Sequence, residues 1–466
     1  MKLALFITII FLCAIHLTAQ ISFHDGTNST LYRYLFQPPA PNSEFVVGVV
    51  DIDGNDLDDI IFFNHDPEVC KKYVTNNRSY FAIPAQLFIA YQQKMVKVPY
   101  NPTGPITPAF IPFTIKKIID DLPLPKGMTI GDIDNNGSKE IIIGGAGDWV
   151  RIIDISGAQP SVEILPTQDF FREFVLQGVN FHDMNFDGNL DLFAANDIHE
   201  NSALTFSQST NKLEINTQIF NFASNPTFCP SLGVANYYDP NSGNYGTVWS
   251  DIDNDGISEV YISKCRGGVI DPASSCRINQ LYKYDQAQNK YIESAAFFNL
   301  DLNAQSWAAD FGDFDNDADL DCIVINHDNQ DANLLRNDLS PNWFTDISNS
   351  LSVPITGISN PYQTFFEDFD NDGLVDILVT ANLEASLYKN TSSNLNSPTP
   401  SISFDKIGSF LLSETLQQEQ SLQTFRSAAI GDLNDDGFPD IYAEYKNGKN
   451  RLFLNSKNSN NFLKVK

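Results

Sequence analysis

The sequence predicts an all-β fold, a seven-bladed β-propeller, from three observations. An acidic loop motif occurs seven times at spacings of 51 to 81 residues, which suits one four-stranded blade with its connections. Short apolar runs rich in β-branched and aromatic residues flank the motif and are typical of strands. Turn-forming Gly, Pro, Asn and Asp are frequent, and helical periodicity is absent. We therefore expect stacked four-stranded sheets, each with an acidic loop between its first two strands.

The motif is clearest in DIDNDGISEVYI, which begins at Asp251. Calcium takes about six to eight oxygen ligands at about 2.3 to 2.6 Å, so a short loop must point several oxygens at one centre. The acids Asp251, Asp253 and Asp255 do this by alternation, and Glu259 can close the cage. A helix-loop-helix calcium hand needs its closing Glu at position twelve, where this loop has Ile262. The motif therefore predicts a calcium loop between two strands.

Every loop offers candidate ligands at positions one, three, five and nine, so we expect up to seven Ca²⁺ sites. Loop by loop, the candidates are Asp51, Asp53, Asn55 and Asp59; Asp132, Asp134, Asn136 and Glu140; Asp183, Asn185, Asp187 and Asp191; Asp251, Asp253, Asp255 and Glu259; Asp313, Asp315, Asp317 and Asp321; Asp368, Asp370, Asp372 and Asp376; and Asp432, Asn434, Asp436 and Asp440. Asparagine supplies oxygen but no charge, so the all-acid loops at Asp251 and Asp368 should bind calcium most tightly.

Position six of the motif is usually glycine, which reaches positive φ without steric cost. The first loop has Asp56 there, and the fifth has Ala318. Aspartate tolerates left-handed geometry moderately well, whereas alanine should be strained.

Charge and the N-terminal residues indicate an exported protein. The formal net charge of -29 over 466 residues argues against nucleic acid as a partner. Lys2 precedes an apolar run from Leu3 to Leu17, with small residues at Thr18 and Ala19, which is typical of a secretory signal over residues 1–20. No later segment is apolar for long enough to span a bilayer. We expect a monomer that is secreted or held at the cell surface, in the periplasm or outside the cell if the source is bacterial.

Five cysteines remain after residue 20, so at least one is unpaired within the chain. Cys265 and Cys276 bracket a loop rich in Gly, Pro and Ser, which suggests that they pair. Cys322 lies in the apolar run DCIVI and is expected to be a buried thiol.

Further strands complete the predicted blades. Third strands are indicated by NQLYKY, ANLLRN, ASLYKN and NRLFLN, and fourth strands by KYIES, NWFTDIS and SFDKIG. The last repeat lacks a clear fourth strand, and Ile21 to Asp25 resembles the missing one. We expect this N-terminal strand to close the ring, with the propeller over residues 21–457 and a tail at 458–466.

With these repeats in view, the chain resembles the FG-GAP/VCBS family, whose seven-bladed propellers include the integrin α-subunit head. The resemblance rests on FGDFDNDADLDCIVIN and EDFDNDGLVDILVT, followed by LLRN or LYKN and then FTDIS. SKCRGGVIDP, RINQLY and NNFLKVK look like segments of exported bacterial ASPIC/UnbV proteins, a group that includes a cartilage acidic protein. The resemblance implies calcium binding and a C-terminal module that is absent or cut off here. It implies no particular activity.

The resemblance also implies that long insertions lie on the face opposite the calcium loops: residues 64–85, 196–202, 222–244 and 263–278. A rigid ring with variable loops on one face suits a binding or adhesion module for an extracellular protein or surface glycan. Two alternatives remain open, a spacer for a C-terminal module and an extracellular hydrolase or lyase. An enzyme would use polar residues at the ends of second strands. These are Asn64, His65 and Asp66; Asp197, His199 and Glu200; Lys264 and Arg266; and His327 and Asp328.

Overall fold

The structure is a computed structural model of the whole chain. It describes residues 23–25, 46–65, 70–75, 78–93, 113–145, 149–166, 176–197, 200–222, 242–266, 273–355, 357–358, 360–381, 385–395, 400–409, 425–445, 451–456, 458 and 460. The predicted secretory signal at 1–20 lies outside these residues, as does most of the predicted C-terminal tail.

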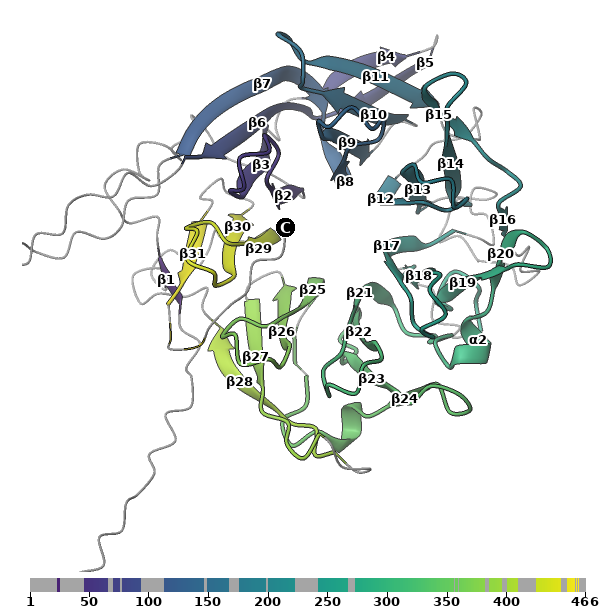
Figure 1. The fold of residues 1–466 in the computed structure, drawn as a ribbon, viewed down its shortest axis with the longest axis vertical. Helices are drawn as coiled ribbons and strands as arrows, with labels where there is room; N and C mark the ends of the chain where they lie inside the picture. Colours follow the sequence, from purple (N-terminus) through teal and green to yellow (C-terminus); the bar gives the residue numbers. More distant parts are fainter. Residues whose placement is uncertain are drawn as a thin grey trace, which may run out of the picture.

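Seven antiparallel sheets form a closed ring, which confirms the predicted all-β, seven-bladed propeller (Figure 1). In chain order the blades are β2 (Val47–Val50), β3 (Asp59–His65), β6 (Pro84–Gln92) and β7 (Phe113–Pro123); β8 (Pro125–Gly131), β9 (Glu140–Gly145), β10 (Trp149–Asp154) and β11 (Ser161–Pro166); β12 (Leu176–His182), β13 (Asp191–Asn196), β14 (Ser202–Ser207) and β15 (Lys212–Ile215); β17 (Asn244–Ser250), β18 (Glu259–Lys264), β19 (Gln280–Asp285) and β20 (Lys290–Glu293); β21 (Ser306–Gly312), β22 (Asp321–Asn326), β23 (Asn333–Asn337) and β24 (Phe344–Asp346); β25 (Pro361–Glu367), β26 (Asp376–Ala381), β27 (Ala385–Asn390) and β28 (Phe404–Ser409); and β29 (Phe425–Gly431), β30 (Asp440–Tyr445) and β31 (Arg451–Asn455).

Three smaller elements supplement the blades. A short strand, β16 (Phe220–Asn221), pairs in parallel with β20 at the outer edge of blade four. The short helices α2 (Ala295–Phe298) and η2 (Ser348–Ser350) lie in the connections that follow blades four and five.

The last blade takes its fourth strand from the other end of the chain. β1 (Phe23–Asp25) pairs antiparallel with β31, with Phe23 opposite Asn455 and Asp25 opposite Phe453. This is the place for which the sequence predicts a strand at Ile21 to Asp25. A second bond at the same seam joins the backbone N–H of Asp432 to Asp58 Oδ2 at 2.8 Å. Residues more than 370 positions apart therefore hold the ring closed.

The hydrophobic core lies between adjacent blades, because the second strands are buried on both faces and the third strands are buried in part. The second strands β9, β13, β18, β22 and β26 are buried along their whole length. One cluster joins blades six and seven through Leu378, Leu387, Ile441 and Phe453. Such continuous apolar strands are what a sheet packed on both sides requires, so stability comes from contacts between neighbouring blades.

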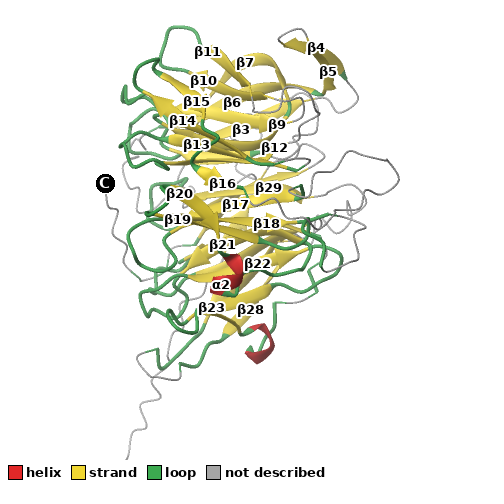
Figure 2. Cartoon of the chain, turned by 90° about the vertical axis from the view of Figure 1, so that its right-hand side faces the viewer, coloured by secondary structure: helices red, strands yellow, loops and turns green. Residues whose placement is uncertain are grey.

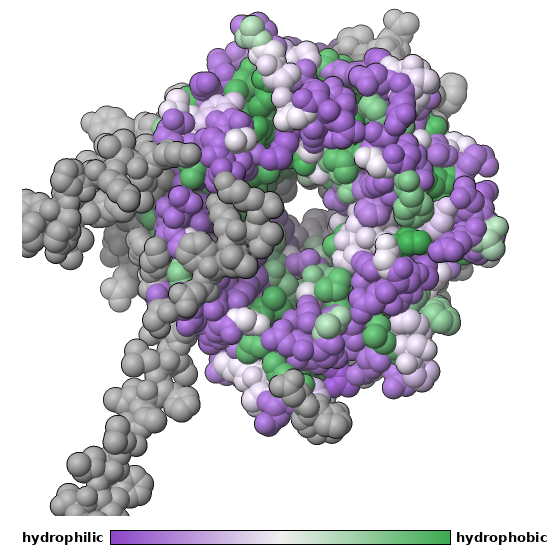
Figure 3. All heavy atoms as spheres, in the orientation of Figure 1, coloured by the Kyte–Doolittle hydropathy of each residue, from purple (hydrophilic) through white to green (hydrophobic). Residues whose placement is uncertain are grey.

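The antiparallel order of each blade gives the disc two distinct faces. Loops between first and second strands all emerge on one face, here called the acidic face, and loops between second and third strands emerge on the opposite face. A hairpin of β4 (Lys71–Thr75) and β5 (Arg78–Ala82) extends between β3 and β6 and therefore belongs to the opposite face (Figure 2). The first strands lie nearest the axis of the ring (Figure 1). The centre of the ring is open in the space-filling view (Figure 3).

The cysteines differ in part from the prediction. Cys276 is in a disulfide but Cys265 is a free, buried thiol, so the predicted pairing of these two residues is wrong. The bonding partner of Cys276 lies outside the described residues. Cys322 is fully buried on β22 and is a free thiol, as the apolar run around it predicts, and burial raises the pKa of that thiol well above its ordinary value.

Candidate metal centres

The seven acidic loops share one hydrogen-bond pattern, which the loop at Asp251 illustrates. The two carboxylate oxygens of Asp251 accept the backbone N–H groups of Asp255 at 3.1 Å and Gly256 at 2.9 Å. One oxygen of Glu259 accepts the N–H of Ile252 at 3.1 Å. The same bonds recur in the other six loops. The alternating acids thus stabilise the loop by accepting hydrogen bonds from its own backbone, and their remaining oxygens face the centre of the loop.

Position six adopts a left-handed conformation in all seven loops. Its φ is 86° at Gly256, 72° at Asp56 and 74° at Ala318. Position four is left-handed as well, and in four loops it is asparagine, a residue that tolerates this geometry. Asp56 and Ala318 therefore adopt the same loop geometry as glycine, with local backbone strain.

Three acidic oxygens approach one another within 4.8 Å in five loops. The groups are Asp51, Asp53 and Asp59; Asp132, Asp134 and Glu140; Asp251, Asp253 and Asp255; Asp313, Asp315 and Asp321; and Asp368, Asp370 and Asp376. In the loops at Asp183 and Asp432, an amide, Asn185 or Asn434, stands at position three.

The donor set fits a hard divalent cation. At position three, one buried side-chain oxygen of Asp253, Asp315, Asp370 and Asn434 receives no hydrogen bond from the part of the chain that the structure describes. The same holds for Oε1 of the closing acid Glu140. Asp315 and Asp370 are 2% and 1% exposed. Buried carboxylate oxygens without donors are costly unless a cation accompanies them, and oxygen-only cages suit calcium.

The pKa values of the closing acids are raised, in part by repulsion from the other acids of the loop. Burial, followed by the nearby acids, raises the pKa of Asp59 and Glu140 to about 7 and that of Asp376 and Asp440 to about 8. Burial likewise raises the pKa of Asp191 to about 6. A bound cation favours the ionised form, so its binding would release protons from these acids.

In two loops a lysine from the third strand of the same blade already meets the acids. Lys283 Nζ lies 2.8 Å from Asp253 Oδ2, 2.6 Å from Asp255 Oδ2 and 2.9 Å from Glu259 Oε1. Burial alone would lower the pKa of Lys283, but these three carboxylates raise it above its ordinary value.

Blade six repeats the arrangement. Lys389 Nζ pairs with Asp370 and lies 2.7 Å from Asp372 Oδ2. Arg336 holds the matching place in blade five, where its guanidinium pairs instead with Asp338, at 2.7 Å. No ion pair joins the acids of that loop to Arg336, although its charge partly offsets the rise in the pKa of Asp315 that burial and the neighbouring acids cause.

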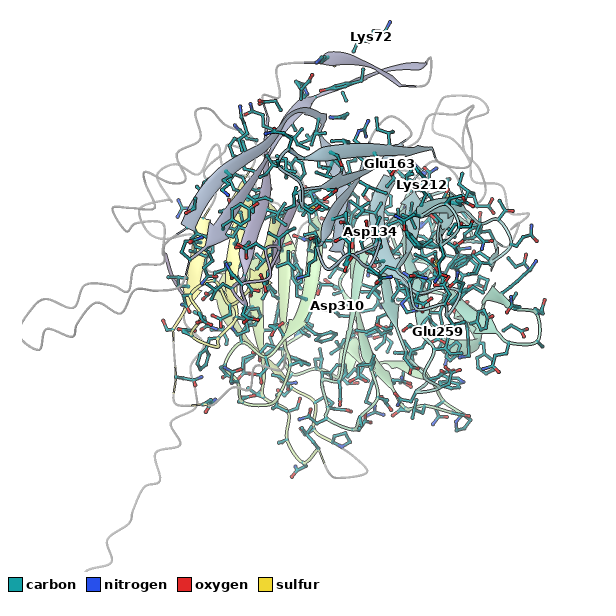
Figure 4. The ribbon with its side chains drawn as sticks, turned by 45° about the horizontal axis from the view of Figure 1, so that its top comes forward. Lys72, Asp134, Glu163, Lys212, Glu259 and Asp310 are labelled. Carbon is teal, nitrogen blue, oxygen red and sulfur yellow. The ribbon has the colours of Figure 1, made fainter. Side chains whose placement is uncertain are left out.

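The loop of blade two opens into a cavity of about 170 Å³ next to blade three. Its walls carry four acids, Asp134, Glu140, Asp154 and Glu163, together with Lys212. Lys212 pairs with Glu163, and the two labelled side chains lie near Asp134 in Figure 4. Asp154 also contributes to raising the pKa of Glu140, so this loop carries more negative charge than its own sequence shows.

Asparagines link neighbouring loops, a role that the acid pattern did not reveal. The backbone N–H of Asn390 donates to the closing acid Asp376, and its Nδ2 donates to the Phe314 carbonyl of the preceding loop, each at 2.8 Å. Asn337 and Asn455 do the same in blades five and seven. The recurrence of Asn at the end of LLRN, LYKN and LFLN is the sequence signal that could have identified this role.

A second set of links runs from position four of one loop to the next loop. Nδ2 of Asn254, Asn316 and Asn371 donates to the carbonyl at position six of the following loop, at 3.2, 2.9 and 3.0 Å. The acidic loops of blades four to seven thus form a connected chain rather than independent sites.

On the opposite face, several of the candidate catalytic residues are bonded to one another or to the backbone. Arg266 Nη2 pairs with Asp197 Oδ1 at 2.9 Å, which joins blade four to blade three. Lys264 is fully buried, and its Nζ donates to Asn244 Oδ1 at 2.8 Å.

Of the three histidines proposed for this face, the structure describes the side chain of His327. The ring of His327 stacks on Trp307 with centroids 3.9 Å apart, and its Nε2 lies 2.8 Å from the Pro361 carbonyl. Asp66 and His199 lie outside the described residues, as does the side chain of His65. All five acidic groups with three converging oxygens belong to the acidic face.

Fold and loops together define a class of protein, a β-propeller with a ring of acidic loops. Consistent with this, a family model for the FG-GAP-like repeat matches residues 313–379 and 368–443, which span blades five to seven. The chain therefore carries FG-GAP-like repeats on a seven-bladed propeller. The match gives no support to the more specific ASPIC/UnbV resemblance.

Other comparisons add little. No curated protein sequence matches the chain. Among solved structures, an Agrocybe aegerita lectin described as recognising non-reducing terminal N-acetylglucosamine shares 12% identity at a TM-score of 0.41, over 71% of this chain and 79% of that one. Similarity at this level carries no functional argument.

Proposed function

We propose that this chain is a secreted calcium-binding β-propeller that acts as a binding or adhesion module for an extracellular protein or glycan. The observation that carries the proposal is a buried side-chain oxygen for which the described residues supply no donor, found at Glu140, Asp315 and Asn434 in the loops of blades two, five and seven. The calcium is structural in this proposal, because each loop joins two core strands. Export rests on the N-terminal sequence, and no helix among the described residues is long and apolar enough to cross a membrane.

Calcium binding is tested by titrating the chelator-treated chain in a calorimeter. The Asp321→Asn variant, which neutralises a closing acid, should lose one site. Asp405→Asn is the matched control, since Asp405 is an exposed acid on β28, away from the loops. No heat of binding in the wild-type chain, or equal loss in both variants, would contradict the proposal.

We place the partner site on the opposite face, where first strands carry β-bulges. Bulges re-aim side chains, and they occur at Tyr245, Trp307 and Tyr362 in blades four, five and six. The rings of Tyr245 and Trp307 are 4.3 Å apart, and those of Trp307 and Tyr362 are 6.0 Å apart. These half-buried aromatic residues form an arc at the mouth of the axis. Aromatic side chains with polar tips suit protein and sugar surfaces alike.

A glycan and protein binding screen, run with calcium and with chelator, would identify the partner. Tyr362→Ala should weaken any binding found, whereas Phe297→Ala, at an exposed aromatic residue on α2 away from the arc, should not. Binding unchanged by Tyr362→Ala would move the partner site elsewhere on the disc.

A further inference from the structure

The residue opposite the closing acid differs from blade to blade. In blade four, Tyr282 pairs with Val260, so the next residue, Lys283, lies opposite Glu259. The same register step places Lys389 opposite Asp376 in blade six and Arg336 opposite Asp321 in blade five. In blade two it places Asp154 opposite Glu140. The residue at this position of the third strand is therefore a lysine in blades four and six and an aspartate in blade two. In blade five it is an arginine that pairs with an acid outside the loop.

Lys283 makes a complete set of bonds inside its loop. An ammonium group has three donors, and Nζ of Lys283 has three carboxylate partners between 2.6 and 2.9 Å. Its side chain is 25% exposed, and that of Lys389 is 14% exposed, so both ammonium groups are partly withdrawn from water. Each lysine uses the acids at positions three and five, two of the positions that a calcium ion would need.

A calcium ion and these ammonium groups therefore compete for the same oxygens. Binding of the ion in blade four would require Lys283 to give up three charge-assisted bonds, or would place two cations side by side. Blade five differs, because Arg336 pairs with Asp338 and no described residue donates to Oδ1 of Asp315.

We propose that Lys283 and Lys389 are resident cations that neutralise the loops of blades four and six in place of calcium. On this proposal, which rests on the proposed function, calcium fills the loops without such a lysine first, and those of blades one, two and five are the leading sites. This order differs from the one expected from the acids alone for the loops at Asp251 and Asp368, because two of the three loops with four acids contain such a lysine and the third, at Asp313, does not.

The test counts calcium ions bound per full-length chain by equilibrium dialysis with atomic spectroscopy, over a range of free calcium. The wild-type chain has seven loops, and the number of calcium ions that it binds should be lower than seven by at least two. Lys283→Met and Lys389→Met should each gain one ion, and the double variant should gain two. Arg336→Met, at the matching place in blade five, should gain none. Lys283→Arg keeps the positive charge and should keep the wild-type count.

Stability provides the second readout. In chelator, Lys283→Met should melt at a lower temperature than the wild-type chain, and calcium should restore it. If the variant does not fold in chelator, the number of calcium ions bound per chain in the presence of calcium still tests the proposal. A wild-type count of seven with unchanged variants would overturn the resident-cation proposal and leave calcium binding intact. No bound calcium in any chain would overturn both.

Discussion

At the scale of single residues, Ala318 carries strain that glycine avoids elsewhere in the ring. Its φ is 74°, a left-handed geometry that costs an L-residue about 1–2 kcal/mol. Ala318→Gly relieves this strain but adds freedom to the unfolded chain, which costs about 0.4–1 kcal/mol. We expect a net gain of about 0.5–1 kcal/mol in the free energy of unfolding, measured with urea.

Gly373 provides the matched control for this change, because it holds the same loop position in blade six with φ 88°. Gly373→Ala should destabilise the chain, since it introduces the strain that Ala318→Gly removes. A loss of stability in Ala318→Gly would show that the alanine side chain makes contacts that outweigh its backbone strain.

Glu444 is a buried acid outside the metal loops. It lies on β30 with no exposure, and neither carboxylate oxygen has a hydrogen-bond partner among the described residues. Burial raises its pKa well above the ordinary value of 4.5. An acid with a raised folded pKa holds its proton more tightly in the folded state. Its contribution to stability is therefore largest below pH 4.5 and falls, by about 1.4 kcal/mol per pH unit, as the pH rises toward the folded pKa.

Glu444→Gln removes this titration. The variant should be more stable than the wild-type chain at pH 7, and the difference should shrink toward pH 4.5. Urea unfolding of both chains in chelator, between pH 4.5 and 8, measures this difference directly. Parallel pH profiles would mean that Glu444 ionises with an ordinary pKa.

At the scale of elements, the most informative strand is β1. Its pairing with β31 completes the last blade and covers an edge that would otherwise be open. Deleting residues 21–25 should lower the free energy of unfolding by about 1–3 kcal/mol, since a few backbone hydrogen bonds of about 1 kcal/mol each are lost. Thermal melting of the truncated chain, with and without a peptide of the deleted segment, measures the effect. Unchanged melting would show that β1 does not hold the ring closed.

The acidic loops could be predicted from the sequence, but the lysine that enters one of them could not. Alternating acids at fixed offsets specify the loop by local backbone bonds, so Asp251 and Glu259 could be placed from the sequence. The occupant of the loop could not, because Lys283 reaches it through strand register, a contact between distant segments. For the same reason the pairing of Cys265 with Cys276 was predicted wrongly: their spacing permits a disulfide, but the fold places Cys265 as a buried free thiol.

At the scale of the whole molecule, the repeat predicted the ring and the number of blades. The coupling between blades required the structure. Asn337, Asn390 and Asn455 each bond to their own closing acid and to the preceding loop. If these loops hold calcium as proposed, its loss from one of them should loosen its neighbours, so blades four to seven should respond to chelation together rather than one by one.

The most direct test of the central claim is scanning calorimetry of the whole chain in chelator and in increasing calcium. A ligand that binds only the folded state stabilises it by about 2.7 kcal/mol per site at a hundredfold excess over its dissociation constant. We predict a melting temperature that rises steadily with calcium, is unaffected by matched magnesium at low concentration, and retains a single main transition. A melting temperature that is the same in chelator and in calcium would contradict the account.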